Sequence, residues 1–162
     1  MQETSPLERV RAFVKRYDPQ LEPIVYEQPL PTSEAAAAAL GSEVGQIAKS
    51  ILFRSGDQFA LFVAAGDVKI HPKQVKAALG SGKAKMASME EVEKVTGYRV
   101  GAVCPFALEQ EVPVIVDTSL RRFPVVYTAA GIAESLLPVT YEALLAMTNA
   151  VEADVAQAPQ AP

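Results

Sequence analysis

Two apolar segments near the middle of the chain constrain its fold more than any other feature. Residues 47–54 and 58–65 are separated only by Ser55, Gly56 and Asp57, a composition typical of a tight turn between two strands. The second segment is apolar at consecutive positions, so both of its faces must be covered. We therefore expect an antiparallel hairpin whose second strand lies in the centre of a covered sheet.

The first of these strands carries a lysine on an apolar face. Alternate side chains of a strand point to the same side, which places Lys49 between Ile47 and Ile51. An ammonium group in apolar surroundings needs an anionic or carbonyl partner, or its pKa falls. We interpret Lys49 as a candidate site residue; the alternative is a lysine near the strand end whose head group extends to solvent.

Helix caps, turn residues and apolar spacing predict the other elements. We expect helices at 5–17, 33–40, 71–79, 88–96 and 140–147, and strands at 23–26, 85–87, 112–116, 123–128 and 135–137. The length of 162 residues fits one domain, which we place at residues 1–150. Residues 151–162 are rich in Ala, Gln and Pro and are expected to form a disordered tail.

Composition excludes several classes of protein. No apolar run is long enough to span a bilayer, and residues 1–11 lack the apolar core of a signal peptide, so we expect a cytoplasmic protein with no membrane partner. The single cysteine and the single histidine leave too few ligands for a zinc site, so we expect neither a metal nor another cofactor. A thiol enzyme using Cys104 is a further hypothesis, although His71 lies on a different segment and a lone cysteine is most often a buried apolar residue.

Charge is distributed unevenly along the chain. Residues 49–122 contain eleven Lys and Arg against eight Asp and Glu, within a protein whose net charge is -4. A basic middle segment suits a polyanion that is bound locally, such as the end of a tRNA. The candidate tRNA-binding residues are Lys69, Lys73, Lys76, Lys83 and Lys85. The alternative is an ordinary solvated surface.

A loop at residues 98–106 is the second informative stretch. Gly101 allows the backbone to approach a ligand and Pro105 stiffens the turn, so the intervening amides can donate to a carbonyl or an oxyanion. Asp117 follows a predicted strand, where a carboxylate is either a site group or a helix cap.

These features occur in an order that resembles the YbaK/prolyl-tRNA-synthetase editing-domain superfamily, which includes aminoacyl-tRNA deacylases of the YbaK and EbsC type. The resemblance spans about residues 26–145 and rests on Glu43-Val44-Gly45-Gln46-Ile47-Ala48-Lys49-Ser50, Ala65-Gly66-Asp67, Gly97-Tyr98, Gly101-Ala102-Val103-Cys104-Pro105-Phe106, Val116-Asp117-Thr118 and Ala130-Gly131. It implies an α+β fold with a mixed, barrel-like sheet surrounded by helices. It also implies metal-free hydrolysis of the ester between a wrong amino acid and the terminal adenosine of a tRNA.

The same resemblance implies roles for individual residues. Lys49 would hold the terminal phosphate or the ester carbonyl, and the loop from Gly101 to Pro105 would orient the carbonyl and the attacking water, so Lys49 and Gly101 are the expected catalytic residues. The expected substrate-binding residues are Tyr26, Gly66, Asp67, Ala102, Val103, Cys104, Pro105, Asp117 and Gly131. The implied partners are the acceptor end of an aminoacyl-tRNA and an aminoacyl-tRNA synthetase.

Two departures from the family pattern leave the amino acid open. This chain has Gln28 where many relatives have a histidine, and Ala130 where several have a glycine. Alanine, cysteine, serine, threonine and a non-protein amino acid are all compatible, while the string from Glu43 to Lys49 resembles a serine- or threonine-editing branch. A non-catalytic module that binds tRNA ends or amino-acid analogues is the alternative function.

Overall fold

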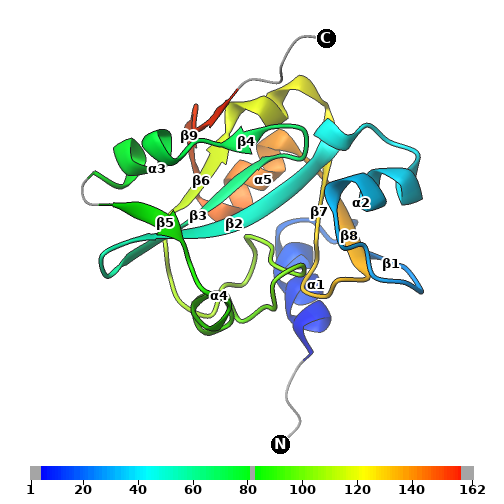
Figure 1. Cartoon of the computed structure of the whole chain (residues 1–162). Coiled ribbons are helices and arrows are strands. Elements are labelled where there is room, and N and C mark those ends of the chain that lie inside the picture. Colours follow the sequence, from blue (N-terminus) through cyan, green and yellow to red (C-terminus); the bar gives the residue numbers. More distant parts are fainter. Residues whose placement is uncertain (1–4, 81–82, 158–162) are drawn as a thin grey trace, which may run out of the picture.

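The computed structural model describes residues 5–80 and 83–157, and it shows an α+β architecture built on a mixed sheet (Figure 1). The strand order in the eight-stranded sheet is β1-β8-β7-β2-β3-β6-β9, and β5 pairs with β2. The strands are β1 (Ile24–Val25), β2 (Ile47–Ser55), β3 (Gln58–Ala65), β5 (Ala84–Met86), β6 (Val114–Asp117), β7 (Val125–Thr128), β8 (Ser135–Thr140) and β9 (Val151–Ala153), with a separate pair of β4 (Lys69–Ile70) and β10 (Ala156–Gln157). The predicted α+β class is confirmed.

The predicted hairpin forms the centre of this sheet. β2 and β3 pair antiparallel from Ala48 opposite Ala65 to Ser55 opposite Gln58, and Gly56 adopts the positive φ of 60° that the turn requires. β3 also pairs in parallel with β6, so it has neighbours on both sides. Residues 60–65 are fully buried, as the apolar sequence predicts.

Helices cover both faces of β3, which explains why that strand is apolar throughout. Leu61 and Val63 belong to the main core, to which α1 (Pro6–Tyr17), α4 (Met89–Thr96) and α5 (Tyr141–Thr148) contribute. Phe62 faces a second core, where Val75 of α3 (Pro72–Leu79) packs. α2 (Ser33–Leu40) contacts the beginning of β2, beside the two 3-10 helices η1 (Val44–Gln46) and η2 (Thr118–Arg122).

The helices begin and end where the sequence predicts. Ser5, Thr32 and Ser88 each accept a hydrogen bond from a backbone amide of the first turn of the helix they cap. Gly41 and Gly97 end their helices with φ of 72° and 82°, a conformation that glycine adopts without steric cost. None of the helices in residues 5–80 and 83–157 is long and apolar enough to cross a membrane.

The prediction of a disordered tail from residue 151 is wrong for residues 151–157. β9 pairs in parallel with β6, and β10 pairs antiparallel with β4. Val155, between the two strands, is only 2% exposed, and its amide donates to a carboxylate oxygen of Asp117 at 2.8 Å. Burial of valine and pairing of the backbone thus order a segment whose composition favours disorder. The rest of the predicted tail, residues 158–162, lies outside the described residues.

Candidate functional site

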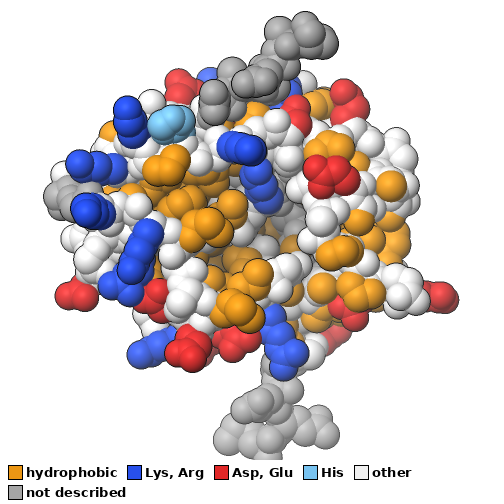
Figure 2. Space-filling view, viewed as in Figure 1, with side chains coloured by type: hydrophobic (Ala, Val, Ile, Leu, Met, Phe, Trp, Pro, Cys, Tyr) orange, Lys and Arg blue, Asp and Glu red, His pale blue; other side chains and the backbone are white. Residues whose placement is uncertain are grey.

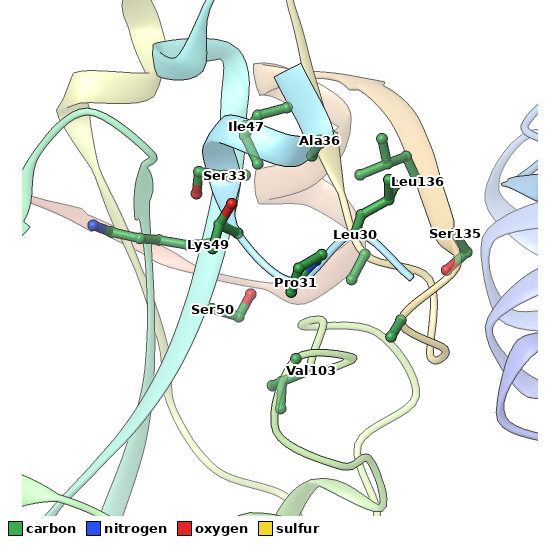
Figure 3. A pocket seen from close by; sticks show the side chains of 15 residues that line it. Leu30, Pro31, Ser33, Ala36, Ile47, Lys49, Ser50, Val103, Ser135 and Leu136 are labelled. Atoms are coloured by element: carbon green, nitrogen blue, oxygen red, sulfur yellow. The ribbon is translucent and has the colours of Figure 1, made fainter. Parts of the chain in front are cut away.

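A narrow cavity of about 140 Å³ opens at the beginning of β2 (Figure 3). Its walls come from the N-terminal end of α2, the loop at residues 101–103 and the segment between β7 and β8. The lining residues are Leu30, Pro31, Thr32, Ser33, Ala36, Ile47, Ala48, Lys49, Ser50, Gly101, Val103, Ala129, Ala133, Ser135 and Leu136. Of the predicted site residues, the structure brings Lys49, Gly101 and Val103 together here.

Lys49 has the half-buried environment that its position in the strand predicts. Its ammonium group donates a hydrogen bond to the backbone carbonyl of Val68, the kind of partner that an amine in apolar surroundings requires. Burial lowers the pKa of Lys49, while the negative charges of Asp67 and Glu34 partly oppose that change. In Figure 3 the side chain extends away from Leu30 and Val103, so its aliphatic stem lines the cavity and its charge lies at the edge.

Asp67 lies on the charged side of Lys49 and not in the cavity wall. Its two carboxylate oxygens accept hydrogen bonds from Arg122 at 2.6 and 2.9 Å, a bidentate geometry that is stronger than a single contact. Chiefly because of this guanidinium group, the pKa of Asp67 is lowered. Arg122 was not predicted as a site residue, because nothing local to residues 121–122 indicates a partner 55 residues away.

The loop at residues 98–106 contributes Gly101 and Val103 to the cavity wall. The amide of Ala102 donates to the carbonyl of Arg99 at 2.9 Å and closes a β-turn, in which Gly101 has the positive φ of 93° that favours glycine. The amides of Gly101 and Val103 make no hydrogen bond to another residue in the described part of the chain. Two backbone N–H groups therefore remain available where both residues line the cavity.

The buried side chain of Tyr98 fixes this loop to the core. Tyr98 is 2% exposed and its hydroxyl donates to the carbonyl of Phe106 at 2.5 Å, which ties the two ends of the loop together. Burial raises the pKa of Tyr98 far above its ordinary value, so this hydroxyl stays a donor. The Tyr98 side chain thus anchors the loop to the core.

Cys104 is part of this anchor and does not reach the cavity. Its side chain is fully buried, and its thiol contacts the carbonyl of Phe106 at 3.9 Å. Burial raises the pKa of Cys104 to about 12, which keeps the thiol protonated at neutral pH. His71 lies elsewhere, where its Nδ1 accepts from the amide of Lys73 at the start of α3. The geometry does not support a thiol mechanism.

Two predicted site glycines, Gly66 and Gly131, lie where the backbone packs closely. A Cβ atom at Gly66 would lie 2.6 Å from the carbonyl oxygen of Val44, and one at Gly131 would lie 2.8 Å from the carbonyl oxygen of Pro6. Gly131 also has a positive φ of 95°. Both positions need glycine because backbone approaches backbone there, and neither residue lines the cavity.

The remaining predicted substrate-binding residues also lie outside the cavity wall. Asp117 is only 3% exposed and accepts hydrogen bonds from the amides of Ser119, Val155 and Ala156, so the helix-cap alternative describes it. Tyr26 packs against the apolar cluster around α2. Ala102 and Pro105 are buried in the loop.

The predicted tRNA-binding lysines are all exposed. Lys73 and Lys76 lie on α3, Lys69 on β4, Lys85 on β5, and Lys83 just before β5. Figure 2 shows Lys and Arg side chains gathered over α3 and β5, and a hollow in the surface between this basic side and α2. None of these five lysines lines the cavity.

Sequence reasoning missed the hydroxyl groups of the cavity. Ser50 Oγ is buried and has no hydrogen-bond partner among the described residues. Ser135 Oγ accepts from the amide of Ala130 at 3.0 Å and donates to the carbonyl of Ile132 at 2.7 Å, which fixes the turn before β8. Ser50 shares a strand face with Ala48 and Leu52, so a hydroxyl group among apolar residues of one face was the available signal. Among the described residues, no group of three or more His, Cys, Asp or Glu side chains could hold a metal ion.

The site is a narrow cavity in a small α+β domain, lined by a half-buried lysine and by backbone amides without partners among the described residues. Comparison with known proteins identifies the family. The aminoacyl-tRNA editing domain matches residues 27–147. Because that match covers most of the chain, the protein belongs to the aminoacyl-tRNA editing domain family.

Individual relatives agree with this assignment. The chain is 39% identical over 135 residues to the uncharacterized protein YwhH of Bacillus subtilis (strain 168), covering 83% of this chain and 85% of that protein. It is 25% identical over 126 residues to EbsC of Enterococcus faecalis, a proposed Cys-tRNA(Pro)/Cys-tRNA(Cys) deacylase, covering 76% of each chain. A crystal structure of a proposed trans-editing enzyme for prolyl tRNA synthetase superposes with a TM-score of 0.89 at 29% identity, covering 97% of this chain and all of that one.

Proposed function

We propose that this protein hydrolyses the ester bond of mischarged aminoacyl-tRNA in the cytoplasm. It would act in trans, on tRNA that an aminoacyl-tRNA synthetase has charged with the wrong amino acid. The observation that carries the proposal is the cavity at the beginning of β2, which Lys49 lines together with Gly101 and Val103, two residues whose backbone amides have no partner in the described part of the chain. Family membership and the names of the relatives support it.

The chemistry requires no protein nucleophile. A water molecule attacks the carbonyl carbon of the ester, and the developing oxyanion accepts hydrogen bonds from the amides of Gly101 and Val103. Fixed backbone dipoles are suited to this task because they need no reorganisation during the reaction. The bond from the carbonyl carbon to the ribose oxygen then breaks, the ribose oxygen takes a proton from the attacking water, and the free amino acid leaves.

Lys49 supplies positive charge at the mouth of the cavity. Its ammonium group exchanges the neutral carbonyl of Val68 for the anionic terminal phosphate, or for the ester carbonyl oxygen as that oxygen becomes negative during attack by water. The flexible stem of lysine allows this movement without a change in β2. Asp67, held by Arg122, stays close enough to maintain the charged form of Lys49.

The size of the cavity selects a small amino acid. A volume of about 140 Å³ leaves room for a short side chain beside the carbonyl group. Its walls combine apolar groups, such as Leu30 and Leu136, with hydroxyl groups from Thr32, Ser33 and Ser50. We therefore infer that the substrate carries alanine, serine, threonine or cysteine, and that hydroxyl-bearing side chains fit best.

A deacylation panel tests this function. Purified protein is mixed with tRNAs charged with alanine, serine, threonine, cysteine or proline, beside the Lys49→Ala variant and a Lys94→Ala control that removes an exposed lysine of α4. Selective hydrolysis by the parent and the control, but not by Lys49→Ala, supports the proposal. Equal hydrolysis by Lys49→Ala would reject the mechanism. Binding of charged tRNA without hydrolysis by any of the three proteins would favour the non-catalytic module.

A further inference from the structure

A second, apolar depression lies directly beside the cavity. It has a volume of about 220 Å³ and runs between the end of β5, the start of α4 and the loop at residues 100–103. Its lining residues are Ser50, Ile51, Leu52, Met86, Ala87, Met89, Val92, Val100, Gly101 and Val103. Ser50, Gly101 and Val103 line the cavity as well, so the two spaces share one wall. We call the second space the methionine groove.

The rim of the methionine groove exposes large apolar side chains to water. Met86 is 63% exposed, Met89 is 70% exposed and Val100 is 59% exposed. Single exposed apolar residues are ordinary on a protein surface, but a cluster around a depression is typical of a binding site. Methionine suits such a site because its thioether is polarizable and packs well against aromatic rings.

Ser50 marks the point where the two spaces meet. Its hydroxyl is buried without a hydrogen-bond partner in the described part of the chain, and its residue lines both the cavity and the groove. A buried hydroxyl group that is left unpaired costs free energy, so such groups in folded proteins usually have a partner. A ligand hydroxyl at this junction would supply one.

The shape of an aminoacylated nucleotide matches this arrangement. Three groups are attached to its ribose: the amino acid through the ester, the base, and the phosphate. If the ester lies at Gly101, as the proposed function requires, the ribose lies at the shared wall and the base points out of the cavity.

We propose that the methionine groove binds the terminal base of the tRNA, with the base packed against Met86 and Met89 and a ribose hydroxyl bonded to Ser50. The inference rests on the proposed function only for the identity of the ligand. A nucleobase fits this groove better than a charged ligand does, because no Lys, Arg, Asp or Glu side chain lines it.

The test measures binding, so that it does not depend on hydrolysis. The probes are 3′-alanylamino-3′-deoxyadenosine 5′-monophosphate, a stable amide analogue of the ester, and its counterpart with hydrogen in place of adenine. Calorimetry should show that the parent binds the first probe at least about tenfold more tightly, the scale of one stacked base. The Met86→Ser/Met89→Ser variant should bind both probes equally.

A Val25→Ser/Val151→Ser variant is the matched control, because both valines are exposed and neither lines the groove. It should keep the preference for the base. Equal binding of the two probes by the parent, or a preference that survives in the methionine variant, would overturn the proposal. Ser50→Ala should abolish the difference between the first probe and its 2′-deoxy form; a difference that persists would overturn the Ser50 contact.

The deacylation panel and the binding measurement can each reject one proposal without rejecting the other. A protein that cleaves charged tRNA but binds both probes equally would keep the proposed function and lose the groove. A protein that cleaves nothing but prefers the probe with adenine would keep the groove and lose the hydrolytic activity.

Discussion

The two acidic residues that follow strands of the central sheet, Asp67 after β3 and Asp117 at the end of β6, are used in different ways. Asp117 is buried and accepts three backbone amide hydrogen bonds, two of them from the C-terminal segment. Asp67 is partly exposed, forms an ion pair with Arg122 and acts on the charge of Lys49. The region around Asp117 therefore holds the fold together, whereas the region around Asp67 and Lys49 sets the electrostatics of the cavity.

The largest expected effect breaks the site and leaves the fold intact. Lys49→Met keeps the length of the apolar stem and removes the charge, so deacylation should fall by about 10²–10³-fold, the cost of removing one group that stabilises charge in a transition state. The free energy of unfolding should not fall, because a half-buried ammonium group costs desolvation. Steady-state kinetics and urea unfolding measure the two effects. A loss of activity that follows a loss of stability would contradict this assignment.

The converse change breaks the fold and spares the site. Asp117→Ala leaves three amide groups without their acceptor and should lower the free energy of unfolding by about 2–4 kcal/mol. Deacylation, measured at a temperature where the variant is still folded, should stay close to that of the parent. Asp57→Ala, in the exposed hairpin turn, is the control and should change neither quantity. A loss of activity in Asp117→Ala without a matching loss of stability would indicate that Asp117 belongs to the functional site.

The dependence of activity on pH tests whether Asp67 acts on the charge of Lys49. Because Asp67 raises the pKa of Lys49 against the effect of burial, Asp67→Asn should lower that pKa further. The alkaline limb of the profile of kcat/KM against pH should then move to lower pH. Glu34→Gln should move it in the same direction by less, since Glu34 has the smaller influence. A limb that does not move in either variant would show that the charge of Lys49 does not govern the reaction.

The ion pair between Asp67 and Arg122 should also appear in stability at low pH. Since Arg122 lowers the pKa of Asp67 in the folded protein, the stabilisation is complete above the unfolded-state pKa of about 3.9 and is lost as the pH falls through the lower folded-state pKa. Both side chains are partly exposed, so the contribution should be no more than about 1 kcal/mol. Acid unfolding of Arg122→Gln, compared with the parent, measures it; an unchanged acid transition would contradict it.

The smallest expected effect concerns the basic surface beyond the cavity. Lys73→Ala and Lys76→Ala each remove an exposed charge from α3, so each should weaken tRNA binding by about two- to fivefold at low salt and reduce the dependence of binding on salt. Lys15→Ala, in the last turn of α1, is the control for net charge. Equal effects at all three positions would mean that only the overall charge matters.

Local patterns were sufficient for the regular elements and for the main site residue. The hairpin of β2 and β3 follows from alternating and continuous apolar positions around a glycine turn, and these signals lie within 19 residues of sequence, from 47 to 65. Lys49 was identifiable because a charge among apolar residues needs an explanation wherever it occurs. Gly101 was singled out because a glycine four residues before a proline indicates a stiff turn whose backbone can approach a ligand.

Long-range contacts account for what the sequence did not reveal. Asp117 was assigned to the substrate because its partners, Val155 and Ala156, lie 38 and 39 residues away in a segment that its composition marked as disordered. The close packing at Gly66 and Gly131 was not foreseen, because a glycine needed for backbone packing looks the same in sequence as one needed for a ligand. Ser50 was missed because only the folded structure shows that its hydroxyl lacks a partner.

The strand pair of β10 and β4 has a practical consequence for anyone who shortens this protein. β4 begins immediately after Val68, whose carbonyl group holds the ammonium of Lys49, and β10 is its pairing partner. A fragment that stops at residue 150, where composition suggests a boundary, would remove both this partner and the amides that bind Asp117. The smallest fragment suitable for enzymology therefore runs through residue 157, and affinity tags are better attached beyond that point.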